Sequence, residues 1–205
     1  MMKKTTAFLF SILFVLNMGF TPKYPHGNGN YVIDNQKSVI EWKGEKFTGD
    51  HSGTIQVKSG TITMEHHMAS KGNFVIDMNT INCTDMEGDS KKDLEDHLKE
   101  DDFFSVSKFP EATFTITGCT PLKDENGNNC TVKGNLTIKG IANEVSFPAL
   151  ITVSGNVLNA KAELKFDRTK WDIKYKSKTV FDDLGDKFIY DDISMKLNLV
   201  ANITH

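Results

Sequence analysis

Two stretches near the C-terminal end of the chain decide the fold: residues 158–166, LNAKAELKF, and residues 193–201, ISMKLNLVA. In both, apolar residues recur at every second position. Because successive side chains of a β-strand point to opposite faces, this period collects the apolar side chains on one face. At about 3.3 Å per residue, each stretch would run close to 30 Å. The two segments therefore predict long amphipathic strands with one dry and one wet face.

Shorter stretches upstream repeat the same alternation. They lie at residues 40–43, 55–58, 74–78, 113–117, 136–139 and 145–147, and turn-forming pairs such as Ser59-Gly60, Asn126-Gly127 and Gly155-Asn156 separate several of them. This succession of short alternating segments and turns predicts an antiparallel, all-β domain of about eight strands. A closed barrel and a two-sheet sandwich fit the pattern equally well.

One segment departs from the period of two. Residues 89–100, DSKKDLEDHLKE, place Leu94 and Leu98 four positions apart, and opposite charges at Lys91 and Glu95 have the same helical spacing. This pattern predicts a single helix of about three turns with a thin apolar stripe. A stripe of that width is expected to rest on the side or the mouth of the sheet.

Length, composition and charge are those of one globular domain. The 205 residues are 39% hydrophobic and 25% charged, and 14 of them are Phe, which is ample material for one core. The formal net charge is −3, and it becomes more negative if a leader that contains Lys3 and Lys4 is removed. An acidic balance of this kind argues against binding to nucleic acid.

The first residues have the layout of a secretory signal peptide. Lys3 and Lys4 precede a nearly continuous apolar run over residues 7–16, which is about half of the roughly 20 residues that span a bilayer. We expect a signal peptide over residues 1–19, a flexible leader over 20–30 and the β-domain over 31–203. The mature protein is then expected to be periplasmic or secreted, with no transmembrane segment after cleavage.

An oxidising compartment raises the question of the three cysteines. With a two-residue turn at Asn126-Gly127, Cys119 and Cys130 are out of register, whereas a longer or bulged loop would bring them together. A disulfide between them and three free thiols both remain open.

No catalytic motif stands out. The chain lacks a Gly-x-Ser-x-Gly elbow, a phosphate-binding glycine loop and a Cys-x-x-Cys pair. Adjacent strand residues such as His66 and His67 would point to opposite faces, which does not suit one metal ion. The sequence predicts neither a metal site nor a cofactor.

Arg168 is the one arginine of the chain. Either it holds a loop by pairing with a carboxylate, or it contacts the head group of a ligand.

Several longer motifs resemble those of the YceI-like family. They are HLKEDDFF at residues 97–104 with KFP at 108–110 and ATF at 112–114, GNLTIKGI at 134–141, and DRTKWDI at 167–173. The opening segments 31–34 and 38–42 fit as well, so that the resemblance covers nearly all of residues 31–203. One departure is Asp172, which stands where many relatives carry Gly.

The resemblance implies an extended, eight-stranded, antiparallel, lipocalin-like β-barrel with one short α-helix, often exported to the periplasm. Such a barrel encloses a polyisoprenoid or a similar amphiphile, and no catalytic residues come with it. Strand parity then selects the inward residues expected to contact the chain: Trp42, Phe74, Ile76, Phe114, Ile116, Leu136, Phe147, Leu164, Met195 and Leu197. A head group is expected at an open mouth near Arg168, Lys170 and Trp171.

The function expected from these residues is therefore binding: an exported protein that sequesters or carries a polyisoprenoid, an isoprenoid quinone or a similar lipid. Two alternatives stay open. One is an enzyme that acts on a small lipid at the barrel mouth through His51 or Asp172. The other is a stress or interaction protein whose barrel is packed full. The identity of the lipid and the oligomeric state, monomer or homodimer, are also left open.

Overall fold

The computed structural model describes residues 27–204. The signal peptide expected over residues 1–19, and the leader as far as residue 26, lie outside the described residues. The end of the expected leader differs from the prediction. Gly29 and Asn30 belong to the first strand, because their backbone pairs with Met64 and Thr63 across the sheet.

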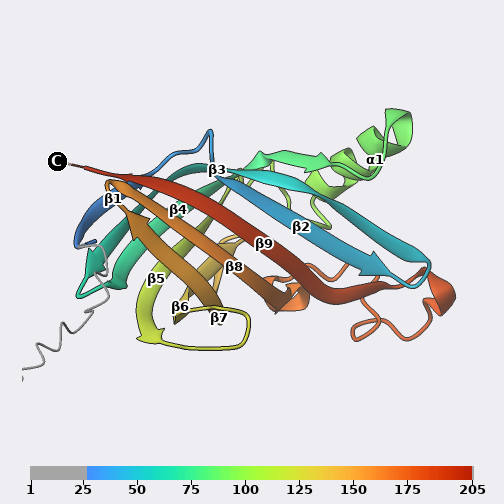
Figure 1. Ribbon diagram of the computed structural model, residues 1–205. Coiled ribbons are helices and arrows are strands. Elements are labelled where there is room, and N and C mark those ends of the chain that lie inside the picture. Colours follow the sequence, from blue (N-terminus) through green and yellow to red (C-terminus); the bar gives the residue numbers. More distant parts are fainter. Residues whose placement is uncertain (1–26, 205) are drawn as a thin grey trace, which may run out of the picture.

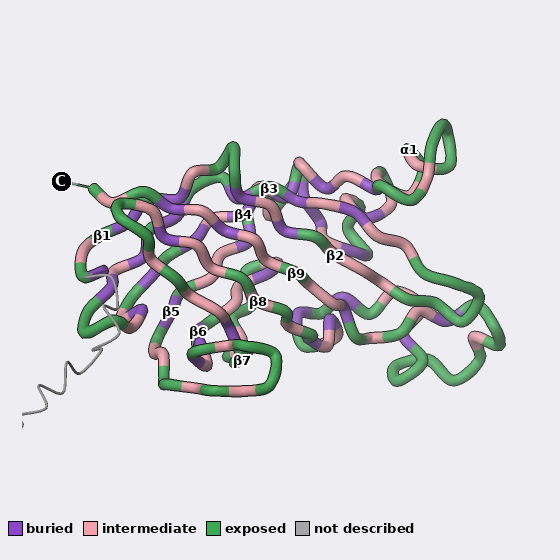
Figure 2. The backbone as a smooth tube through the Cα atoms, in the orientation of Figure 1, coloured by how far each residue is buried: buried purple, intermediate pink, exposed green. Residues whose placement is uncertain are grey.

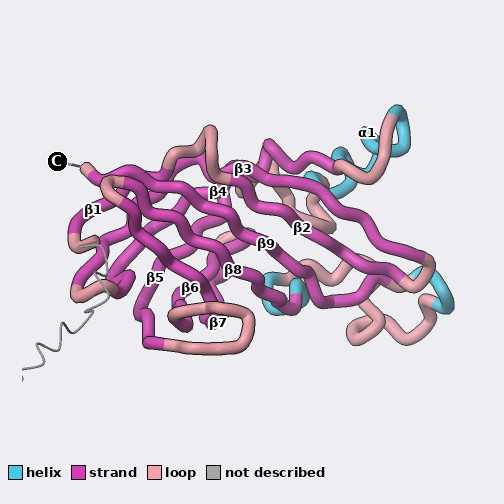
Figure 3. The backbone as a smooth tube through the Cα atoms, viewed as in Figure 1, coloured by secondary structure: helices cyan, strands magenta, loops and turns pink. Residues whose placement is uncertain are grey.

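Nine strand segments, one α-helix and two short 3₁₀ helices make up the described chain (Figures 1 and 3). The strands are β1 (Gly29–Ile33), β2 (Val39–Lys46), β3 (Gly49–Glu65), β4 (Met68–Cys83), β5 (Glu111–Pro121), β6 (Cys130–Ile138), β7 (Ile141–Ser154), β8 (Val157–Asp167) and β9 (Ile189–Ile203). The helices are α1 (Gly88–Lys99), η1 (Arg168–Trp171) and η2 (Gly185–Lys187).

The strands close into an eight-stranded antiparallel barrel, which confirms the predicted fold class and decides against the sandwich. The order runs β2–β9–β8–β7–β6–β5–β4–β3, and β3 pairs back onto β2. β1 also pairs with both β3 and β9, so β1 and β2 occupy one place in the barrel, one after the other. The barrel is elongated, with the C-terminus at one end and α1 near the other (Figure 1).

The two stretches that decided the fold pair with each other without interruption. The register of β8 and β9 runs from Val157 opposite Asn202 to Asp167 opposite Asp192 with no bulge. Buried and more exposed residues alternate along many of the strands (Figure 2), as an amphipathic barrel wall requires. The buried residues form one core inside the barrel.

Tight turns fix the register of the neighbouring hairpins. Lys139 and Gly140, between β6 and β7, both have positive φ, the geometry of the two-residue turns that suit twisted strands. His66 and His67 also have positive φ and form the turn between β3 and β4. They are therefore turn residues rather than the strand neighbours that the sequence suggested.

The pairing of β3 with β4 is less regular. Thr54 is opposite Asn82 but Gln56 is opposite Asp77, so that β4 bulges at residues 78–81. Thr80 stabilises this bulge, because its hydroxyl donates to the Asp77 carbonyl at 2.6 Å and accepts from the Gln56 amide at 2.9 Å. The bulge bends β4 close to α1.

The α-helix lies within one residue of its predicted bounds. Leu98 is buried and Leu94 packs half-buried against the core, as the apolar stripe predicts. After α1, Phe103 and Phe104 pack with ring centroids 5.1 Å apart. The helix and this pair of rings lie at the end of the barrel at which β4 ends, and they pack against the core there.

The segment after β8 is held by one buried cation. Arg168 is fully buried and donates to the backbone carbonyls of Ile173, Ile189 and Tyr190. It also lies 3.4 Å from the carboxylate of Asp191. Of the two interpretations that the sequence left open, these contacts are those of a residue that holds a loop.

Asp172, which follows η1, has a φ of 59° and a ψ of 28°. This is the left-handed conformation that glycine adopts most readily and that Asp tolerates better than most residues. The backbone is therefore of the kind that a Gly at this position would favour, although this chain carries Asp.

The three cysteines are free thiols. A bulge between Ile116 and Gly118 places Cys119 opposite Val132, while Cys130 is opposite Pro121, so that the two thiols lie on a diagonal of the same sheet face. A hydrogen bond from the Cys130 thiol lowers the pKa of Cys119 and raises that of Cys130. The longer loop thus brings the two thiols into contact without a disulfide between them.

Candidate functional site

The barrel encloses an elongated cavity of about 250 Å³. Its wall is built from the inward side chains of β2–β9 together with α1 and the Phe103–Phe104 pair. Beyond the far end of the cavity, toward the C-terminus, lie Tyr31, Met64 and Leu158, which are buried and do not line the cavity. The barrel therefore is not filled by its own side chains, and this differs from the packed alternative that the sequence left open.

All ten residues expected to contact a ligand lie on the wall of this cavity: Trp42, Phe74, Ile76, Phe114, Ile116, Leu136, Phe147, Leu164, Met195 and Leu197. They come from seven different strands, and strand parity alone identified them. That they bind a ligand remains a prediction. Strand pairing also brings Ala160 and Ala162 of β8 to the wall, where their small side chains leave room.

Large aromatic rings lie flat against the wall because glycines lie beneath them. A Cβ atom on Gly134 would come within 2.5 Å of the Phe114 ring, and one on Gly53 within 2.5 Å of the Trp42 ring. Each ring thus occupies the space that a neighbouring side chain would need. The centroids of Phe74 and Phe114 are 6.1 Å apart, and those of Phe114 and Phe147 are 5.6 Å apart. These rings line the lumen rather than cross it.

Polar residues join the wall at one end only, near α1 and the β2–β3 hairpin: Glu45, Lys46, His51 and His97. His51 is fixed on both sides. Its Nε2 lies 3.2 Å from Lys46 Nζ, and its Nδ1 lies 3.0 Å from Asp85 Oδ2. This end of the cavity is its polar mouth, and we use that name below for these four residues.

Asp85 organises the edge of the polar mouth. Its Oδ1 accepts from the Ser52 amide at 3.1 Å and from the Cys83 thiol at 2.9 Å, while Oδ2 contacts His51. Burial by itself would raise the pKa of Asp85, but the hydrogen bonds from Cys83, Ser52 and His51 outweigh it and lower the pKa to about 2. Burial raises the pKa of the Cys83 thiol, which keeps it a donor.

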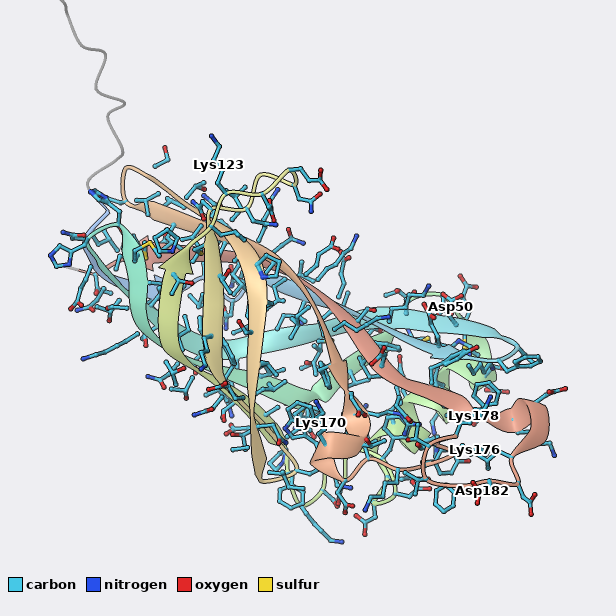
Figure 4. All side chains as sticks on the ribbon, turned by 90° about the horizontal axis from the view of Figure 1, so that it is seen from below. Asp50, Lys123, Lys170, Lys176, Lys178 and Asp182 are labelled. Carbon is cyan, nitrogen blue, oxygen red and sulfur yellow. The ribbon has the colours of Figure 1, made fainter. Side chains whose placement is uncertain are left out.

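The structure does not bring the three residues predicted near a head group to this cavity. Arg168 is buried against backbone carbonyls, and Trp171 is buried with its Nε1 donating to the Leu136 carbonyl at 3.0 Å. Lys170 is exposed on η1 (Figure 4), and neither it nor Asp172 lines the cavity. Figure 4 shows Lys170 in the same half of the molecule as Lys176, Lys178 and Asp182, and Lys123 of the β5–β6 loop in the other half. Of the four residues of the polar mouth, the sequence singled out only His51, as a residue of the enzyme alternative. Glu45, Lys46 and His97 were missed, since a hairpin and a helix supply them and only the closed barrel brings these two elements together.

Two groups of side chains have donor atoms close enough to share a cation: His51 with Cys83 and Asp85, and His97 with Glu100 and Asp102. In the first group, hydrogen bonds within the trio and to Lys46 and Ser52 already satisfy the donors and acceptors. These contacts join the trio, Lys46 and Ser52 in one hydrogen-bonded network.

None of the helices between residues 27 and 204 is long and apolar enough to cross a membrane.

Comparison with solved structures supports the barrel architecture. BcnA of Burkholderia cenocepacia superimposes with a TM-score of 0.64 at 23% identity, over 83% of this chain and 99% of that one. A domain from Saccharophagus degradans, described as a polyisoprenoid binding domain, superimposes with a TM-score of 0.59 at 16% identity, over 85% and 98%. At these identities the likeness is one of fold.

Sequence comparison gives the family. A UPF0312 protein of Yersinia enterocolitica is 35% identical over 98 residues, 48% of this chain and 46% of that protein. Protein YceI of Salmonella arizonae is 33% identical over 106 residues, 51% of this chain and 50% of that protein. The chain thus spans about half the length of these curated relatives. The family model of the YceI-like domain matches residues 31–201, which is almost the whole barrel, and the chain therefore belongs to the YceI-like domain family.

Proposed function

We propose that this protein is an exported carrier that binds one long apolar chain, of the polyisoprenoid class, inside its barrel. The observation that carries the proposal is the elongated cavity with its apolar wall and its single polar mouth. Burial of hydrocarbon yields roughly 25 cal/mol per Å² of apolar surface removed from water, and a narrow tube removes most of a chain's surface.

The size of the cavity favours one narrow chain over a bulky ligand. Its volume of about 250 Å³ lies just below the usual range of small-molecule sites, and residues of strands β2 to β9 form its wall. A relative with the same fold is described as a polyisoprenoid binding domain, which supports this class of ligand. The charged start of the chain, Lys3-Lys4, and the apolar run after it support export.

The proposal is tested by what the protein carries when it is purified. The full-length gene is expressed in a Gram-negative host, and the protein recovered from the envelope is extracted with organic solvent and analysed by mass spectrometry. We expect one isoprenoid or similar long-chain lipid at near-stoichiometric amount. If no lipid is recovered and the protein also fails to bind added geranylgeraniol, the carrier function is excluded.

A matched pair of variants ties the lipid to the cavity. Ala162→Phe adds a ring on the wall, whereas Lys161→Phe adds the same ring on the exposed face of the same strand. We expect Lys161→Phe to retain the lipid and Ala162→Phe to lose most of it. Equal retention by both variants would place the lipid elsewhere on the protein.

The enzyme alternative rests on the place of His51 in the polar mouth. Turnover of a lipid that is abolished by His51→Ala would favour it over the carrier function. Asp172 is exposed beside Lys174 and does not line the cavity. Asp172→Ala should therefore leave the turnover of a lipid at the polar mouth unchanged.

A further inference from the structure

Four exposed apolar side chains gather at the end of the barrel that carries the polar mouth. They are Phe47 in the β2–β3 turn, Val180 and Phe181 between η1 and η2, and Tyr190 on β9, each 41–54% exposed. Figure 1 shows the tip of the β2–β3 hairpin and the start of β9 at the same end, away from the C-terminus. We call these four residues the apolar rim. Exposed apolar side chains that cluster in this way mark an interaction surface.

Principle contacts join the rim to the opening of the cavity. Phe47 directly follows Lys46 of the polar mouth, and its amide donates to the Phe188 carbonyl at 3.4 Å. The ring of Phe188 lies between those of Phe47 and Tyr190, with centroid distances of 5.6 and 5.1 Å. Ile189, between Phe188 and Tyr190 in the chain, lines the cavity. The rim therefore borders the opening.

The segment that carries the rest of the rim also lies beside the opening. Ser177 forms a bridge with the wall residue Ile189, and the Phe181 amide donates to the Ser177 carbonyl at 3.0 Å. Tyr175 packs edge-on against His97 of the polar mouth at a centroid distance of 4.4 Å. None of the four rim residues lines the cavity itself. Changes to the rim therefore leave the cavity wall intact.

The charges around the rim nearly cancel. Residues 43–50 and 174–190 contain six lysines and five acidic residues. Lys43 contacts Glu45 at 3.0 Å and Asp50 at 3.4 Å. Lys178 Nζ lies 4.8 Å from the centroid of the Phe188 ring, so that its aliphatic stem lies near the ring while the charge stays in water. A partner of this surface would be held by apolar contacts rather than by net charge.

The rim is small for a stable protein interface. A large aromatic side chain has about 200 Å² of surface, and about half of each rim side chain is exposed, which gives on the order of 400 Å² in total. A specific protein–protein interface takes about 800 Å² from each partner. A bilayer needs no complementary surface, and aromatic side chains with lysines around them suit its head-group layer.

We propose that the apolar rim docks on the surface of a zwitterionic phospholipid bilayer and holds the polar mouth against it. The inference rests on the proposed function for its choice of partner, because a lipid ligand is taken from a bilayer or returned to one. A rim that borders the opening lets the chain move between bilayer and cavity without crossing bulk water.

Flotation with vesicles of pure phosphatidylcholine tests the docking. The double variant Phe47→Ser, Phe181→Ser removes two exposed rings from the rim, whereas Val32→Ser removes an exposed apolar side chain from β1, at the opposite end of the barrel. We expect the double variant to lower the partition onto vesicles at least roughly 10-fold, and Val32→Ser to change it less than about 2-fold. Added sodium chloride should have little effect.

The comparison is made among proteins purified from the envelope in the same way. All of them carry the same N-terminal sequence, so any contribution of that segment to flotation is common to them. Circular dichroism checks the fold of each variant.

A transfer experiment connects docking with the cavity. Geranylgeraniol is offered either in solution or in phosphatidylcholine vesicles, and the fluorescence of Trp42, which lines the cavity, follows its uptake. The double variant should keep the dissociation constant measured in solution, because the rim does not line the cavity. Its rate of uptake from vesicles should fall by the same factor as its partition onto them.

The outcomes separate this inference from the proposed function. If wild-type protein does not float, if the double variant floats equally well, or if salt abolishes flotation, apolar docking is overturned while binding of the chain stands. A rim-dependent dimer without flotation would overturn it too, and would assign the rim to a protein interface. If the protein floats through its rim but binds no geranylgeraniol, the proposed function fails and the docking surface stands.

Discussion

Arg168 shows how one residue can hold a whole segment of this barrel in place. Its guanidinium reaches three backbone carbonyls and the Asp191 carboxylate from a fully buried position. Ile173 lies in the segment between β8 and β9, and the other partners are the first residues of β9. The planar guanidinium has several donors in fixed directions and can bind these acceptors at once, whereas the single ammonium group of Lys could not reach all of them.

We expect Arg168→Met to lower the free energy of unfolding by about 3 kcal/mol, because it leaves a partly buried carboxylate and several carbonyls without their donor. Lys170→Met, two residues along and exposed, should change it by less than about 0.5 kcal/mol. Urea unfolding followed by circular dichroism measures both values. Similar losses in the two variants would mean that the buried contacts of Arg168 contribute little.

Asp85 gives a prediction about pH. Its pKa in the folded protein, about 2, is below the ordinary value of 3.8, so it stabilises the fold above pH 4 and loses this contribution as pH falls toward 2. Wild-type protein should therefore exceed Asp85→Asn in stability by about 1 kcal/mol at pH 6, a value reduced by partial exposure to solvent. Urea unfolding at pH 6, 4 and 3 should show this difference shrinking; a constant difference would contradict it.

At the scale of single residues, the sequence predicted some roles and not others. The ten wall residues follow from strand parity, which needs only local alternation. The role of Arg168 depends on partners such as Ile189 and Asp191, which lie about twenty residues away along the chain, and on whether the guanidinium is buried. The spacing of residues along the chain does not predict these partners or the burial of a side chain, because both arise only when the barrel has closed.

At the scale of elements, the inner wall depends on pairs of a glycine and a ring on neighbouring strands. Gly134 of β6 lies beneath Phe114 of β5, and a Cβ there would also approach the Thr115 carbonyl to 2.4 Å. Gly118, on β5, has nothing within 4 Å of the same atom. The two glycines thus make a matched pair for the effect of one methyl group.

We expect Gly134→Ala to cost about 1–3 kcal/mol of stability and to push the Phe114 ring into the lumen, so that binding of geranylgeraniol weakens. Gly118→Ala should leave both properties almost unchanged. Thermal unfolding and a fluorescence titration measure the two effects. Unchanged lipid binding by Gly134→Ala would show that the Phe114 ring does not control the width of the cavity.

Strands differed in how far the sequence determined them. β8 was predicted to within one residue at each end, whereas β9 begins four residues before and ends two residues after the predicted stretch; both were recognised because their alternation is long and their pairing is unbroken. In β4 the alternation from Phe74 to Met78 is correct, but the bulge after it is invisible in the pattern, since Thr80 fills it with side-chain hydrogen bonds. The sequence also did not predict that β1 and β2 share one place in the barrel. This is visible only from their pairing, since β1 pairs with the second half of β3 and β2 with its first half.

At the scale of the whole molecule, closure of the barrel makes the site. The sequence allowed a barrel or a sandwich, and the motifs that resemble the YceI-like family favoured the barrel. Whether the interior is full or hollow could not be read from periodicity, because it depends on how rings such as those of Trp42 and Phe114 lie against the opposite glycines.

A cavity that runs along the barrel predicts that affinity depends on chain length. Each additional isoprene unit buries more hydrocarbon, so the dissociation constant should fall at least tenfold from farnesol to geranylgeraniol. It should stop falling once the chain reaches the buried residues beyond the far end of the cavity. Titrations with a series of prenols measure this trend; an affinity independent of length would indicate a ligand bound only at the mouth.

The three buried residues beyond the far end of the cavity, Tyr31, Met64 and Leu158, limit how a ligand could enter and leave the barrel. Under the proposed function, the described residues leave the cavity open only at the polar mouth, so that a bound chain would enter tail first and leave head first through the same opening. The supplier of the chain and its receiver would then have to meet this opening one after the other.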